Sequence, residues 1–71
     1  MIYKIINGRD GQPFAVQYEN NGVVYTIPFD PANTDYAQFK KAISEETAQL
    51  QDAEGNLMTA QAAKDFIKEL P

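Results

Sequence analysis

The stretch from Ile27 to Tyr36 constrains the fold of this chain most strongly, because it separates a strand pattern from a helix pattern. It reads Ile-Pro-Phe-Asp-Pro-Ala-Asn-Thr-Asp-Tyr. Proline fixes φ and has no N–H group to give to a sheet, so the prolines end the preceding strand. The polar side chains that follow can accept hydrogen bonds from the unpaired N–H groups of a helix start. The residues expected to form this strand-to-helix junction are Pro28, Asp30, Pro31, Asn33, Asp35 and Tyr36.

Before the junction, the pattern predicts a strand over residues 2–6 and then a β-hairpin. The runs 14–20 and 23–29 flank Asn21-Gly22, the pair favoured by a type I′ turn, which needs positive φ at both positions. Because side chains alternate along a strand, one face should carry the cross-strand pairs Tyr18–Tyr25, Val16–Ile27 and Phe14–Phe29. We expect this face to be the core. A loop at Asn20-Asn21 would shift the register by two residues and leave both faces intact.

After the junction, Tyr36, Phe39 and Ile43 recur at helical spacing and predict a helix that ends between residues 44 and 47. Asp35 with Gln38 has the spacing of a capping box, and Asn33 or Thr34 is an equally good N-cap.

The segment 48–51 alternates and favours a short strand or an extended segment, and residues 52–55 suit a type I turn. Thr59 is a candidate cap for a last helix, whose apolar residues are Ala63, Phe66, Ile67 and Leu70. The sequence thus predicts a single α+β domain over residues 1–71. Its expected fold is an antiparallel three-stranded β-meander followed by two short helices. Both helices should pack on the face bearing Val16, Tyr25 and Ile27, with a small turn or hairpin between them.

Composition narrows the possible functions. The chain has no cysteine and no histidine, which removes disulfides and the usual zinc ligands, and absent cysteine suits an intracellular origin. Ten acidic and six basic residues give a formal charge of −4, and the cations are scattered, so we expect no nucleic-acid partner. The chain has no apolar run of membrane-spanning length, and its start is too short and strand-like for a signal peptide. We therefore expect a soluble, unprocessed protein with no membrane partner.

No residue pattern predicts catalysis or metal binding. Ser44 is the single serine and has no histidine to activate it, which argues against nucleophilic catalysis. Asp30 and Asp35 could form a carboxylate pair, but aspartate at such a junction ordinarily accepts local hydrogen bonds. The acidic segment from Asp52 lacks the glycine and glutamate spacing of a calcium loop. We expect no enzyme activity, no catalytic residue, no cofactor and no metal.

The first strand is the candidate interaction surface. Ile2, Tyr3, Ile5 and Ile6 are apolar on both faces of one strand, so one face would leave apolar groups uncovered. A small domain without disulfides or metal has little core, and a meander leaves its first strand at an edge. The sequence therefore predicts self-association, or docking to another protein, through this strand. The alternative is that the segment around Leu50 and Leu57 covers the strand within one chain.

The junction, followed three residues later by Phe39, resembles a motif in small proteins encoded by tailed bacteriophages, written IPxDPANxDYxxF. The similarity extends through the segment 50–59 to the last helix, although Ile43 stands where a tryptophan often lies in those proteins. The resemblance implies a virion-associated or tail-gene-neighbourhood protein and no site residue. We therefore expect a non-enzymatic phage protein that works through protein–protein contacts as a virion or assembly component. The alternative is a regulatory protein that binds a host protein during infection. These readings place the chain in the virion or in the host cytoplasm.

Overall fold

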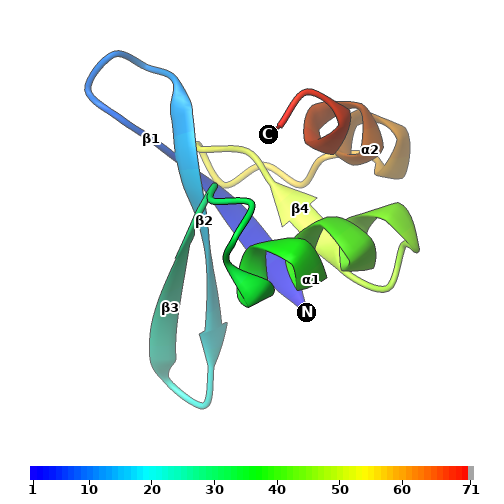
Figure 1. The fold of residues 1–71 in the computed structure, drawn as a ribbon, viewed down its shortest axis with the longest axis horizontal. Coiled ribbons are helices and arrows are strands. Elements are labelled where there is room, and N and C mark those ends of the chain that lie inside the picture. Colours follow the sequence, from blue (N-terminus) through cyan, green and yellow to red (C-terminus); the bar gives the residue numbers. More distant parts are fainter. Residues whose placement is uncertain (71) are drawn as a thin grey trace.

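The computed structural model describes residues 1–70, so Pro71 lies outside the described residues. Four strands and two helices follow one another (Figure 1): β1 (Ile2–Asn7), β2 (Pro13–Asn20), β3 (Val23–Pro28), α1 (Thr34–Ser44), β4 (Gln49–Gln51) and α2 (Ala60–Lys68). The sheet order is β3-β2-β1-β4. The predicted antiparallel meander of β1, β2 and β3 is present, and both helices follow it. The sheet is nevertheless mixed and has four strands, because β4 adds to β1 in parallel.

The hairpin β2–β3 has the predicted register. Tyr18 pairs with Tyr25 and Val16 with Ile27, and the loop is Asn21-Gly22. Their φ angles of 53° and 79° are the positive values that a type I′ turn requires. The N–H of Phe29 donates to the carbonyl of Phe14 at 3.3 Å, which continues the ladder one step past the end of β3.

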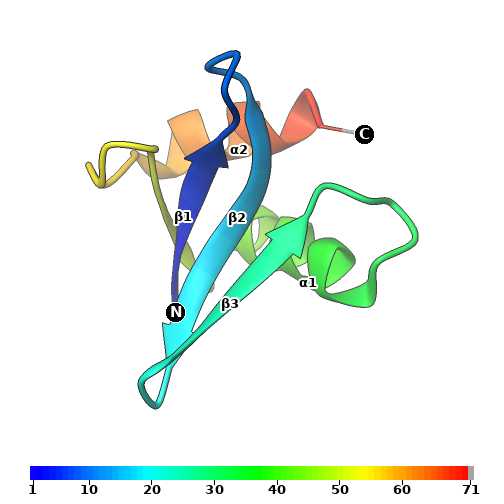
Figure 2. The same ribbon diagram turned by 90° about the vertical axis from the view of Figure 1, so that its left-hand side faces the viewer.

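The core lies between one face of the sheet and the two helices, which Figure 2 shows behind the sheet. The sheet contributes Tyr3, Ile5, Val16, Ile27 and Leu50, and the helices contribute Tyr36, Phe39, Ile43, Ala63 and Ile67. Tyr3 joins the strands to α1, because its ring packs edge-on against Tyr18 at 5.5 Å and against Phe39 at 4.8 Å. The predicted core positions of both helices are therefore confirmed, with Phe66 and Leu70 only partly buried.

Two residues assigned to the core from the strand pattern are exposed. Phe14 keeps 53% of its surface accessible and Tyr25 keeps 44%. The alternation of side chains along a strand predicts on which face of the sheet a residue lies. Whether a helix covers that residue depends on how far the helices extend along the strand. The hairpin tip extends beyond both helices (Figures 1 and 2), and Tyr25 stacks on half-buried Tyr18 at 5.0 Å while its own ring stays partly exposed.

Local hydrogen bonds set the helix starts. The side-chain oxygen of Asn33 accepts from the N–H of Tyr36 at 3.1 Å, which identifies Asn33 as the N-cap of α1 among the candidates. Thr59 caps α2 as predicted, accepting from the N–H of Ala62 at 3.1 Å. The C-cap of α1 is Glu45, inside the predicted range.

A tight turn brings the chain back beside β4. The side chain of Asp52 accepts from the N–H groups of Glu54 and Asn56, each at 2.9 Å. Gly55 donates its N–H to the carbonyl of Asp52 at 3.0 Å, which is the predicted four-residue turn. No helix within residues 1–70 is long and apolar enough to cross a membrane.

Candidate functional site

The junction motif is used for local structure. The side chain of Asp30 accepts from the N–H of Ala32 at 3.0 Å, and its carbonyl accepts from the N–H of Asn33 at 2.8 Å. Asp35 lies in the first turn of α1, where the helix dipole favours a negative charge. Tyr36 is buried, and the ammonium of Lys40 lies 5.3 Å from the centre of its ring. Pro28 and Pro31 are exposed on either side of the bend. The motif therefore builds the strand-to-helix connection.

Among residues 1–70, the signatures of a reactive site are sparse. No group of three or more acidic side chains is close enough to hold a metal ion. Every buried side-chain nitrogen or oxygen there has a hydrogen-bond partner. Burial raises the pKa of Tyr3 above its ordinary value of 10.0, and the neighbouring Tyr18 and Asp35 add to the shift. Burial also raises the pKa of Tyr36. Both phenols are thereby kept protonated, which is the reverse of an activated nucleophile.

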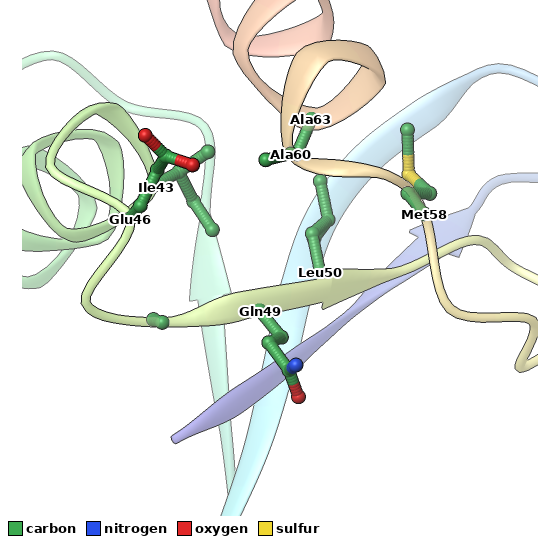
Figure 3. A pocket seen from close by; sticks show the side chains of 8 residues that line it. Ile43, Glu46, Gln49, Leu50, Met58, Ala60 and Ala63 are labelled. Atoms are coloured by element: carbon green, nitrogen blue, oxygen red, sulfur yellow. The ribbon is translucent and has the colours of Figure 1, made fainter.

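A hollow beside the core lies between the end of α1, β4 and α2 (Figure 3). It has a volume of about 200 Å³ and is lined mainly by apolar side chains, among them Ile43, Leu50, Met58 and Ala63. Figure 3 shows Leu50 pointing toward α2, whereas Gln49 points to the opposite side of β4. Glu46 lies at the rim and is paired with Lys64 at 2.9 Å. The hollow can take a small apolar group, but it offers no converging polar groups for chemistry.

The predicted surface on the first strand is divided by the fold. Tyr3 and Ile5 are each 6% exposed and belong to the core, while Ile2 is 48% exposed and Ile6 is half-buried on the other face. The strand β1 is also not an edge, because it pairs with β2 on one side and with β4 on the other. The prediction that the chain associates through unpaired main-chain N–H and C=O groups of the first strand is therefore wrong, because this strand is paired on both sides.

The structure confirms the alternative, in which a later segment of the same chain covers the first strand. Tyr3 of β1 faces Leu50 of β4, and the N–H of Gln49 donates to the carbonyl of Met1 at 2.9 Å. The outer side of β4 is covered in turn, since the N–H of Met58 donates to the carbonyl of Leu50 at 2.8 Å. The segment around Leu50 and Leu57 thus covers this side of the sheet within one chain.

The remaining sheet edge, β3, is open. Antiparallel pairing alternates between residues that bond to the partner strand and residues whose N–H and C=O point away from it. The hydrogen bond from Phe29 to Phe14 fixes this alternation, so the main-chain groups of Val24 and Thr26 point outward. Val23, Val24 and Tyr25 are 51%, 57% and 44% exposed. The β3 edge, residues Val23 to Pro28, is thus an uncovered ladder with apolar side chains.

A three-stranded meander has two edges, and the first strand was chosen from the sequence as the contact, although a signal in favour of the β3 edge was present. Native edge strands are commonly protected by charged side chains. Residues 20–29 contain no charged residue, so no charge in this strand opposes the approach of another strand.

Comparison of the chain with protein-family models, with curated proteins and with solved structures finds no match.

Proposed function

We propose that this chain is a small non-enzymatic bacteriophage protein that acts through protein–protein contacts, as a component of the virion or of its assembly. The phage origin rests on the resemblance of the junction motif. The mode of action rests on one observation, the open β3 edge. Its outward N–H and C=O groups and its half-exposed valines are suited to accept a strand from another protein chain.

The distribution of polar groups supports this mode of action over catalysis. The carboxylates of Asp30 and Asp52 accept main-chain N–H bonds within their own turns. Glu46 is held by Lys64. These groups are occupied in maintaining the fold, whereas the β3 edge has hydrogen-bonding capacity that the fold does not use. Self-pairing or pairing with another protein uses that capacity directly.

The test uses mass spectrometry of purified phage particles to compare the wild-type chain with a variant that carries one charged substitution in β3. Val24→Lys puts a cation beside its cross-strand partner Glu19, so the isolated fold tolerates it, and edge lysines oppose strand addition. Leu57→Lys is the matched control, since Leu57 is 55% exposed and lies away from β3. We expect the wild-type chain and L57K at constant copy number in the particles of the phage that encodes it. We expect V24K to be reduced at least tenfold.

Two outcomes would overturn parts of the proposal. Absence of the wild-type chain from particles would remove the virion role. If a host protein then co-purified with the wild-type chain and L57K but not with V24K, the regulatory reading would replace it. Equal incorporation of V24K and wild type would show that the β3 edge is not the contact.

A further inference from the structure

We propose that the β3 edge pairs with the β3 edge of a second copy of this chain, antiparallel and about a two-fold axis that passes through Tyr25. This inference rests on the proposed function and names the partner of the same surface. The two sheets would join into one continuous sheet, with the helices of both copies on the same face.

The main chain selects this register. With Tyr25 facing Tyr25 of the second copy, Val24 faces Thr26 of the second copy, and each outward N–H donates to the carbonyl of the residue opposite. Sliding the register one way brings Pro28 into the ladder, where it has no N–H. The carbonyl of Pro28 also already accepts from the N–H of Asp30 at 2.9 Å. Sliding it the other way brings Gly22, a turn residue with φ of 79°, opposite a strand residue. The register centred on Tyr25 therefore gives hydrogen-bond partners to the largest number of outward main-chain N–H and C=O groups.

Charge favours a second copy over a foreign strand. The edge has no charged side chain by which to select a partner, so the complementary strand is an uncharged one, and β3 itself is such a strand. The closest acidic side chain on the neighbouring strand is Glu19, which pairs with Val24. In the joined sheet the two Glu19 side chains would lie on the order of 15 Å apart, beyond the Debye length at physiological salt. The negative charge of Glu19 is thus kept away from its symmetry mate across the contact.

Shape and area set the strength of the contact. The hairpin tip extends beyond the helices (Figure 2), and Tyr25 keeps 44% of its surface accessible, which can be covered by a second tyrosine. The exposed parts of Val23, Val24 and Tyr25 from two copies, with the main chain between them, amount to on the order of 700 Å². Stable interfaces are larger, so the dimer should be weak and should form at micromolar concentrations or above.

A cysteine scan tests the register, because the chain has no cysteine of its own. Each register brings a different residue opposite itself on the two-fold axis. Only non-hydrogen-bonded antiparallel pairs bring facing side chains closest. Under mild oxidation, Tyr25→Cys should form disulfide dimers at least tenfold faster than Val24→Cys, Thr26→Cys or the exposed control Leu57→Cys. Circular dichroism checks that each variant is folded.

Sedimentation equilibrium of the wild-type chain completes the test without any variant. The mean mass should rise from 7.9 kDa toward twice that value with concentration, and Val24→Lys should weaken this rise. A mass of 7.9 kDa up to millimolar concentration would overturn the self-pairing. Equal cross-linking rates at positions 24, 25 and 26 would overturn the register. Neither result affects the virion measurement above, so failure of this inference is distinguishable from failure of the proposed function.

Discussion

Leu50 should be among the most costly residues to truncate, although it lies in the shortest strand. Its side chain is fully buried, faces Tyr3 across the parallel pair and points toward α2. Replacing a buried leucine by alanine costs about 2.7–5 kcal/mol, and the cost grows with the cavity that remains. Here the space would open into the existing hollow of about 200 Å³, whose rim at Glu46 is exposed to solvent, so water can fill part of the space and the cavity penalty is smaller. We therefore expect Leu50→Ala to cost about 2–3 kcal/mol.

That loss is a large fraction of the total, since a chain of this length is expected to be stable by about 4–10 kcal/mol. The melting temperature should fall by roughly 10–20 °C, measured by circular dichroism together with urea unfolding. Leu57→Ala makes the same chemical change at a residue that is 55% exposed on the adjoining segment, and it should cost under about 0.5 kcal/mol. If the two variants lost equal stability, or if Leu50→Ala unfolded with the wild-type midpoint, the packing of β4 against the core would be wrong.

Two further predictions concern the helix start and the alkaline limit of stability. Asn33→Ala removes the acceptor of the Tyr36 N–H and should lower the unfolding free energy by about 1 kcal/mol, whereas Asn33→Asp should keep it; equal urea midpoints for all three proteins would contradict the cap. Because burial raises the pKa of Tyr3 above 10.0, the folded state holds that proton more tightly than the unfolded chain. Its contribution to stability is complete below pH 10 and is lost as the pH rises through the folded-state pKa. Phenolate absorbance that develops above pH 10.0 should therefore be smaller in Tyr3→Phe than in the wild-type chain, with buried Tyr36 contributing part of what remains, and an unchanged titration in Tyr3→Phe would refute this.

Local signals in the sequence predicted the elements, because their causes lie within a few residues. Asn21 and Gly22 are suited to the two positive φ angles of a type I′ turn, and that two-residue turn fixes the pairing of Tyr18 with Tyr25. In the same way, Asn33 caps α1 through a bond that spans three residues.

The features that the sequence did not predict depend on distant parts of the chain. The alternation of residues 48–51 favours a short strand, but three residues carry no information about the partner strand, so the parallel pairing of β4 with β1 is visible only when the two segments are placed together. The same pairing decides that β3, and not β1, is the open edge. Whether Tyr25 is covered depends on how far the helices reach, and periodicity carries no information about that.

The parallel pairing of β1 with β4 also has a consequence for the order in which the protein is made. Ile2 pairs with Gln49, so the second partner of the first strand is synthesised long after it. The hairpin β2–β3 and its pairing with β1 can form while the chain is still on the ribosome. Until residue 51 has emerged, however, one side of β1 keeps its unpaired main-chain groups and Tyr3 lacks Leu50 beside it. The strand β1 thus leaves the ribosome before β2 and β3 and is completely paired only after both.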